Sequence, residues 1–173
     1  MEYLVQRLEA RLGKEEMHAT ATWCAADQAR FDALVGYMLG ADEEIARRAA
    51  WVFQHAVEMY PERATPHVGN MVSRLEKPAH NGIQRSIMRS LVHLPIPEAS
   101  HMPLMERGFA LLDDPKVPVA VRVFSMMVLE RLVIPYPELC CELSLVIESH
   151  MPDGSAGFKS RGRKVLKNLQ RRF

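Results

Sequence analysis

Four arginines recur along the chain at nearly regular intervals, which is the spacing expected when one guanidinium interaction is repeated in successive structural units. They are Arg47, Arg85, Arg122 and Arg163. The intervals between them are 38, 37 and 41 residues, and each arginine is followed by apolar residues two and six positions later. Because a guanidinium forms charge-assisted hydrogen bonds, the spacing predicts the same bonding role in each unit of a periodic fold.

A second set of residues lies four and eight positions after the first two of these arginines. Trp51 and Arg89 occupy the first offset, and His55 and His93 occupy the second. On helices these positions point away from the apolar stripe, so we predict that they share one surface with Arg48. Cationic and aromatic groups on a concave surface could grip a peptide or an anion. Two alternatives remain: Trp51 packs beneath the N-terminal residues, and the histidines are solvated.

The C-terminal segment is strongly basic. Residues 158–173 contain seven lysines and arginines and no acid, whereas the preceding 157 residues carry 15 basic and 21 acidic side chains, a formal charge of −6. The predicted basic patch consists of Lys159, Arg161, Lys164, Lys167 and Arg171. The segment is either a capping helix with a solvated basic side or a site for an acidic partner. Nucleic acid is one such partner, although the acidic remainder of the chain would repel it.

The sequence offers no recognisable catalytic or metal-binding motif. It contains no Gly-x-Gly-x-x-Gly, Gly-x-x-x-x-Gly-Lys or Gly-x-Ser-x-Gly stretch. The seven histidines include no pair spaced i, i+4, and no compact set of His, Cys and Asp resembles a zinc or iron site. We therefore predict no catalytic residue, no metal and no cofactor.

Apolar residues at helical spacing indicate the elements that position these side chains. Phe31, Leu34, Val35 and Met38 form one such stripe, and three similar stripes begin at Val68, Leu104 and Leu139. Each stripe ends at residues that break helices, and a second helix that carries one of the arginines follows. The period lies close to the 40 to 47 residues of two-helix solenoid repeats. The sequence thus predicts an all-α fold of about four helical hairpins that stack into an α-α superhelix.

The length of 173 residues and the apolar fraction of 48% suit one domain over residues 1–173. We expect a helical N-terminal cap at 1–26 and repeats at 27–62, 63–97, 98–134 and 135–173.

The composition favours a cytoplasmic protein. The formal net charge is +1, so no overall field attracts nucleic acid or a membrane. Cys24, Cys140 and Cys141 are too few and odd in number for a disulfide framework, and we expect the neighbouring pair to be buried thiols. We see neither an export signal nor a stretch apolar enough to span a bilayer.

Three segments resemble a small bacterial HEAT-like family of armadillo-type repeats without established function. They are residues 47–53 (RRAAWVF), 118–126 (PVAVRVFSM) and 155–164 (SAGFKSRGRK). In HEAT-like repeats an arginine commonly hydrogen-bonds turn residues of its own hairpin, which here would be residues such as Asp42 or Asp114. Members of the family are sometimes labelled adenylosuccinate lyase, which implies a metabolic enzyme. The serine-bearing Gly-Ser-Ser-x-Met-Pro-x-Lys-x-Asn loop of such lyases is absent from this sequence.

These observations predict a non-enzymatic module that presents a concave helical surface to an unidentified protein or peptide. The first alternative is a nucleic-acid-associated protein, similar in shape to the HEAT-like alkylpurine DNA glycosylases, that uses the basic C-terminal helix. The second alternative is the lyase activity that the family label implies. The sequence carries no indication of the oligomeric state.

Overall fold

The structure, a computed structural model, describes residues 2–10, 12–77 and 79–172. Over these residues the chain is all-α, with ten α-helices, three 3₁₀ helices and no β-strand. The α-helices are α1 (Glu2–Glu9), α2 (Lys14–Ala25), α3 (Gln28–Leu39), α4 (Glu43–Met59), α5 (Val68–Glu76), α6 (Asn81–Leu91), α7 (His101–Asp113), α8 (Val119–Leu132), α9 (Cys140–Ser149) and α10 (Ala156–Arg172). The 3₁₀ helices are η1 (Pro61–His67), η2 (Glu98–Ser100) and η3 (Pro137–Leu139).

The chain divides into two compact units, which we call unit 1 (Met1–Ser100) and unit 2 (His101–Phe173). Unit 1 contains the N-terminal helices α1 and α2 and the hairpins α3–α4 and α5–α6, and unit 2 contains the hairpins α7–α8 and α9–α10. The predicted all-α fold of four hairpins preceded by N-terminal helices is confirmed. The grouping of residues 1–173 into a single domain stays a prediction.

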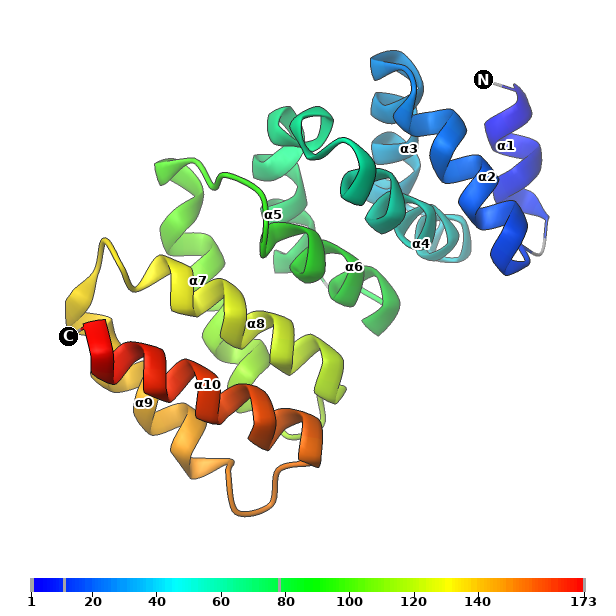
Figure 1. Ribbon diagram of the computed structural model, residues 1–173. Coiled ribbons are helices and arrows are strands. Elements are labelled where there is room, and N and C mark those ends of the chain that lie inside the picture. The colour runs from blue at the N-terminus through cyan, green and yellow to red at the C-terminus, as the bar shows by residue number, and fades with distance from the viewer. Residues whose placement is uncertain (1, 11, 78, 173) are drawn as a thin grey trace. The chain divides into compact units, whose positions relative to one another are not determined.

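The helices of unit 1 form two layers (Figure 1). Helix α4 contacts α2 and α6, so α4 lies between them, and α3 and α5 lie in the second layer. Phe31 of α3 and Phe53 of α4 are fully buried, and their ring centroids lie 5.6 Å apart. Leu4 and Leu8 of α1 are also fully buried, and α1 contacts α4. The predicted apolar stripes therefore form the core between the layers.

In unit 2, α8 contacts α10 and α7 contacts α9, while each first helix also contacts its own second helix. Two glycines lie where the helices of a hairpin approach closely. A Cβ atom added to Gly108 would lie 3.1 Å from a methyl carbon of Leu129, and one added to Gly162 would lie 2.9 Å from the sulfur of Met151. Both glycines are buried, so this unit depends on small residues at two helix contacts.

Aspartate side chains begin the two helices of the first hairpin. Asp27 accepts a hydrogen bond of 3.0 Å from the amide of Arg30, and Asp42 accepts bonds of 3.0 Å from the amides of Glu44 and Ile45. The first amides of a helix have no partner within the helix, and such caps satisfy them. Asp42 therefore caps the N-terminus of α4.

The buried positions of the second helices align the repeats differently from the spacing of the arginines. With an offset of 38 residues, buried Ala46 of α4 aligns with buried Gln84 of α6, and Gln84 aligns with buried Arg122 of α8. Arg47 and Arg85 lie one position later and are exposed. The prediction that these three arginines share one position is wrong, because only Arg122 points into the core.

Arg163 lies outside this register as well. The four buried residues Val121, Ser125, Val128 and Leu132 of α8 match, with an offset of 37 residues, Phe158, Gly162, Val165 and Leu169 of α10, which are also buried. In this alignment the residue of α10 that is equivalent to Arg122 is Lys159, and not Arg163. The predicted interval of 41 residues is four residues too long, which is about one helical turn.

Arg122 joins three helices of unit 2. Its Nε donates a hydrogen bond of 2.8 Å to the carbonyl of Leu112 in α7, and its guanidinium carbon lies 4.6 Å from the ring centroid of Phe158 in α10. The side chain is buried, which lowers its pKa, and the carboxylates of Asp113 and Asp114 oppose that shift. Arg122 therefore bonds to its own hairpin, as expected, but through a backbone carbonyl of α7.

A Pro-Glu pair marks each junction between successive hairpins. The pairs are Pro61-Glu62, Pro97-Glu98 and Pro137-Glu138, and they accompany η1, η2 and η3. Proline suits the first position of a helix because its φ is fixed and its missing N–H would be unpaired there. A carboxylate in the first turn also complements the helix dipole. These pairs are a periodic signal that the arginine spacing does not capture.

Candidate functional site

The five residues predicted to share a surface lie on the second helices of unit 1 or directly after them. Arg48, Trp51 and His55 lie on α4, Arg89 lies on α6, and His93 follows α6. The three positions on α4 are spaced i, i+3, i+7, which places them on one face of the helix. Two hollows are lined by members of this set, one beside Trp51 and one beside Arg89.

Arg48 is engaged with the N-terminal helix. Its Nη1 donates hydrogen bonds of 2.8 Å and 2.6 Å to the carbonyls of Leu8 and Glu9, and its Nη2 forms an ion pair with Glu44. The carbonyls belong to the end of α1, where the last carbonyls of a helix lack partners within it. Arg48 therefore holds α1 against α4.

Trp51 is half-buried and lines the first hollow, which has a volume of about 360 Å³. The hollow is lined by Leu12, Glu44, Arg47, Arg48 and Trp51. Leu12 lies in the segment between α1 and α2, so the indole lies beside the N-terminal residues, as one interpretation of the sequence expected. Trp51 as a whole is neither fully buried nor fully exposed.

His55 belongs to the contact between α2 and α4. Its ring meets the ring of His18 edge-on, with centroids 4.8 Å apart, and its Nδ1 lies 3.4 Å from a carboxylate oxygen of Glu58. Burial lowers the pKa of His55, and Glu58 only partly opposes that shift. The lowered pKa favours the neutral imidazole, and the side-chain nitrogen of Gln54 lies 3.2 Å from its Nε2.

The second hollow lies between α4 and α6 and has a volume of about 280 Å³. It is lined by Gln54, Val57, Glu58, Pro61, Arg89, Ser90 and His93. Arg89 forms an ion pair with Glu58, and the buried carbonyl oxygen of Gln54 accepts a hydrogen bond of 3.1 Å from Ser86. Gln54 and Ser90 are not among the site residues predicted from the sequence. The signal that could have found them is a buried polar residue in an otherwise apolar register.

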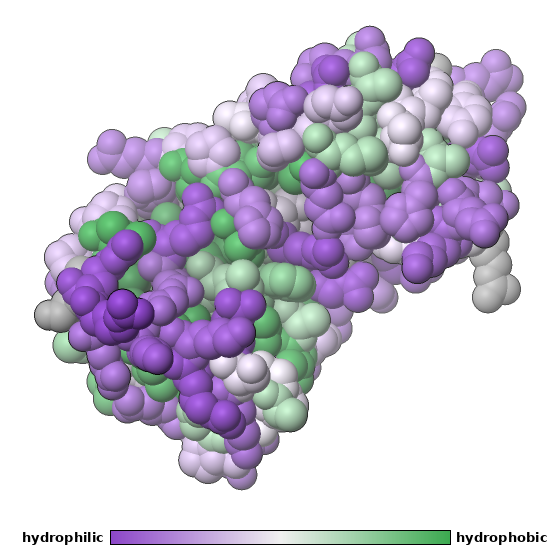
Figure 2. Space-filling model, in the orientation of Figure 1, coloured by the Kyte–Doolittle hydropathy of each residue, from purple (hydrophilic) through white to green (hydrophobic). Residues whose placement is uncertain are grey.

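The predicted basic patch divides into two kinds of residue. The ammonium group of Lys159 donates a hydrogen bond of 3.0 Å to the carbonyl of Pro152, and Arg161 is half-buried. The exposed members are Lys164, Lys167 and Arg171, which we call the basic stripe. Their i, i+3, i+7 spacing places them on one face of α10, and Figure 2 shows strongly hydrophilic side chains over this helix.

The described residues were compared with the requirements of metal binding and thiol chemistry. Among them, no group of three His, Cys, Asp or Glu side chains is placed to hold a metal ion. Burial raises the pKa of the Cys24 thiol to about 12, so this thiol stays protonated. Cys141 is exposed, so the expectation of a buried pair is wrong. The buried face of α9 contains Leu143 and Ile147, and Cys141 lies off that face.

Within the part of the chain that the structure describes, no helix combines the length and apolarity needed to cross a membrane. In the comparison with known families, the family model of the HEAT repeat domain matches residues 4–169. The match covers nearly the whole chain, from α1 to residue 169 within α10. Comparisons with curated proteins and with solved structures found no match.

Proposed function

The chain belongs to the HEAT repeat domain family, and from this premise we propose that it is a non-enzymatic, cytoplasmic interaction module for a protein or peptide. Helical repeats offer extended surfaces for partners without needing catalytic groups. The three free thiols agree with a reducing compartment. The single observation that carries the proposal is the hollow between α4 and α6, which the second helices of unit 1 line.

The lining of this hollow suits a peptide better than a uniformly charged polymer. Val57 and Pro61 supply apolar surface, while Gln54 and Ser90 supply polar groups. Arg89 is already paired with Glu58, so both signs of charge lie at the hollow. A polyanion would meet the carboxylate as well as the guanidinium, whereas a peptide can present mixed groups.

The two hollows of unit 1 lie along one face of α4. Trp51 lines the first hollow and Glu58 lines the second, and seven residues of helix separate them by about 10 Å. An extended peptide covers that distance with about three residues. We therefore propose that one peptide segment contacts Trp51 and the Arg89–His93 region together, so that an aromatic anchor and polar contacts act on the same partner.

Site-specific photocrosslinking tests this surface. A benzophenone amino acid at position 93 is expected to give discrete adducts with a partner in cell extract, and the same group at Ser73 of α5 serves as the control. Ser73 is exposed and lies in the other layer of unit 1. Arg89→Glu in the position-93 protein is expected to weaken adduct formation about fivefold, the effect of losing roughly 1 kcal/mol at an interface. Equal adducts from positions 73 and 93, unaffected by Arg89→Glu, would show that the surface is not the binding site.

Nucleic acid is the second candidate partner, and the basic stripe of α10 is the observation that favours it. Lysines and arginines that neutralise phosphates release counterions, so binding to duplex DNA is expected to weaken steeply with salt. Replacing Lys164 and Lys167 with alanine is expected to reduce the slope of log K against log salt by about two. Fluorescence anisotropy with labelled duplex DNA measures both quantities. No binding at low salt would remove this candidate.

A further inference from the structure

One side of α9 faces away from α7, the first helix of the preceding hairpin. The imidazole of His150, directly after α9, lies 2.9 Å from a carboxylate oxygen of Asp113 at the end of α7. Residues two apart in a helix point to nearly opposite sides, because each residue turns the helix by about 100°. Glu148 therefore points away from α7. Four residues at helical spacing form this side, which we call the α9 strip: Cys141, Ser144, Leu145 and Glu148.

The α9 helix is more apolar than its own burial requires. Six of its ten residues are apolar, counting the two cysteines, but only Leu143 and Ile147 are buried. Leu145 in the α9 strip is 66% exposed, the largest fraction among the exposed large hydrophobic residues of the described chain. The outer side of a repeat that stays in water is normally polar. The α9 strip therefore indicates a surface that a partner covers.

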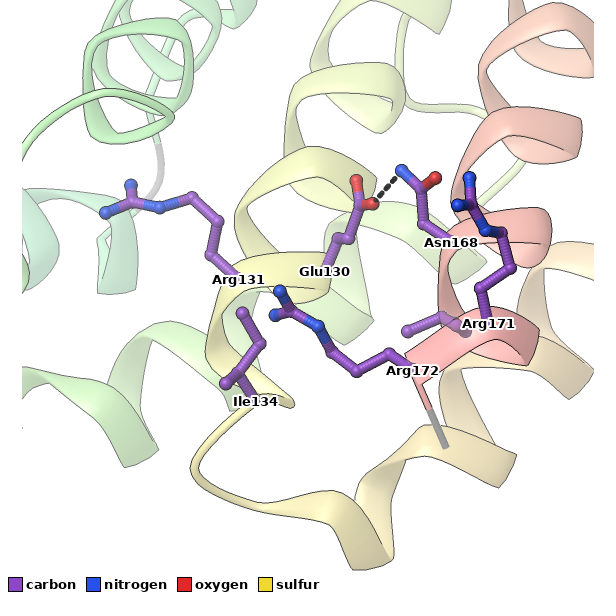
Figure 3. A pocket seen from close by; sticks show the side chains of 7 residues that line it. Glu130, Arg131, Ile134, Asn168, Arg171 and Arg172 are labelled. Atoms are coloured by element: carbon purple, nitrogen blue, oxygen red, sulfur yellow. Dashed lines mark hydrogen bonds between the residues drawn. The ribbon is translucent and has the colours of Figure 1, made fainter.

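One side of α10 likewise faces away from α8. Asn168 donates a hydrogen bond of 2.7 Å to a carboxylate oxygen of Glu130 in α8 (Figure 3). Leu166 and Gln170 lie two positions on either side of Asn168, so they point away from α8. This side, which we call the α10 strip, consists of Arg163, Leu166, Lys167 and Gln170. Leu166 is half-buried, and the other three residues are exposed.

The two strips are complementary when they are read in opposite directions. Both have the spacing i, i+3, i+4, i+7, so an antiparallel pairing aligns all four positions. The aligned pairs are Glu148 with Arg163, Leu145 with Leu166, Ser144 with Lys167, and Cys141 with Gln170. An acid thus meets a base, and a leucine meets a leucine. Among the residues that the structure describes, neither Glu148 nor Arg163 forms an ion pair.

A second copy of the chain can supply the facing strip at the right level. Within one copy both strips point away from the preceding hairpin, so they cannot meet each other. A Cβ added to Gly162 would lie 3.1 Å from a methyl carbon of Ile147, so these two residues are level along the antiparallel helices. Glu148 and Arg163 follow them by one residue in opposite directions, and their levels differ by about 3 Å. A side chain spans that difference.

Charge selects one of the two symmetric arrangements of such a pair. A two-fold axis parallel to the helices places α9 of each copy on α10 of the other, keeps every residue at its level and forms each contact twice. A two-fold axis across the helices would place α10 on α10. That helix carries seven lysines and arginines and no acid, whereas α9 carries two glutamates and no base. Repulsion disfavours the second arrangement.

We propose that the chain self-associates as a symmetric dimer in which the α9 strip of each copy packs on the α10 strip of the other. The leucines supply the apolar contact, and the ion pairs fix the partner and its orientation. Each strip is only about 10 Å long, so the interface is smaller than a standard one and the dissociation constant is on the order of 10 µM. The strips belong to unit 2, so the proposal does not depend on the peptide surface of unit 1.

Sedimentation velocity of the full-length protein tests the proposal. Between about 1 and about 500 µM, a range that brackets the expected constant, we expect the mean sedimentation coefficient to rise from the monomer value toward the dimer value. Glu148→Arg and Arg163→Glu are each expected to weaken association at least tenfold, because like charges then face each other twice. Circular dichroism of each variant checks that the fold is kept.

Mixing the two variants gives the sharpest result. In a mixed dimer, arginine at position 148 of one copy meets glutamate at position 163 of the other, and the native pair forms at the second contact. Two variants that are monomeric alone are therefore expected to associate when combined, with an affinity within about threefold of the original. General attraction between oppositely charged molecules is controlled by Glu142→Arg and Lys164→Glu, which make the same charge changes on exposed positions of the same helices outside the strips.

The control variants are expected to change self-association less than threefold, alone or mixed. A chain that stays monomeric at the highest concentration would leave the strips to a different partner and would overturn the proposal. A mixture of Glu148→Arg and Arg163→Glu that does not associate would overturn it as well. The same holds if the control variants weaken association as much as the strip variants do.

Discussion

Replacing Arg122 with methionine is expected to lower the free energy of unfolding of unit 2 by about 3 kcal/mol. Arg122 is 6% exposed, and its guanidinium donates to the Leu112 carbonyl and stacks on Phe158, so one side chain connects α8 with α7 and α10. A hydrogen bond from a charged group contributes about 1.5–3 kcal/mol, and a buried cation–π contact adds about 1–2 kcal/mol. Methionine fills much of the volume but leaves the Leu112 carbonyl without this donor, which adds to the loss.

Arg85→Met is the matched control for this prediction. Arg85 occupies the same place in the sequence pattern of α6, but it is exposed, and the change is expected to stay within about 0.5 kcal/mol. Urea denaturation followed by circular dichroism gives both values, and hydrogen exchange of peptides from α7 to α10 assigns the loss to unit 2. Equal losses in the two variants would mean that the burial of Arg122 does not determine its contribution to the free energy of unfolding.

The comparison of these two arginines shows why the fold was predictable and its register was not. Apolar stripes such as Phe31, Leu34 and Val35 fix helices because burial of apolar area dominates stability. Arginine spacing carries less information, since a long side chain is accommodated either on the surface or, when paired, in the core. A shift of one position along the helix decides between these outcomes: Arg85 is exposed on the surface, whereas Arg122 is buried in the core.

For the candidate site, the sequence predicted which helix face the residues share, but not which residues they contact. Helical spacing placed Trp51 and His55 on one side of α4, but the partners come from distant segments. The contact of His18 with His55 and the bond of Ser86 to Gln54 join residues 37 and 32 positions apart. Sequence spacing within one helix contains no information on such pairs.

Replacing Gly162 with leucine is expected to lower the free energy of unfolding by about 2 kcal/mol. Glycine in the interior of a helix costs about 1 kcal/mol relative to alanine or leucine, so an open position would gain from the change. Gly162 is not open, because an added Cβ would lie 2.9 Å from the sulfur of Met151 and 3.1 Å from a methyl carbon of Ile147. Met151 can move, but the β-branched Ile147 is stiff, and overpacking costs about 1–3 kcal/mol or more.

Gly36→Leu is the matched control, and it is expected to change stability in the opposite direction. Gly36 lies inside α3, and a Cβ added there meets no atom within 4 Å, so the substitution should stabilise by about 0.5–1 kcal/mol. Chemical denaturation of the two variants under identical conditions gives the sign directly. If both variants were stabilised, the close approach of α10 to α9 would not require a glycine. Opposite signs would show that helix propensity is sacrificed at Gly162 because the helices of this hairpin must approach closely.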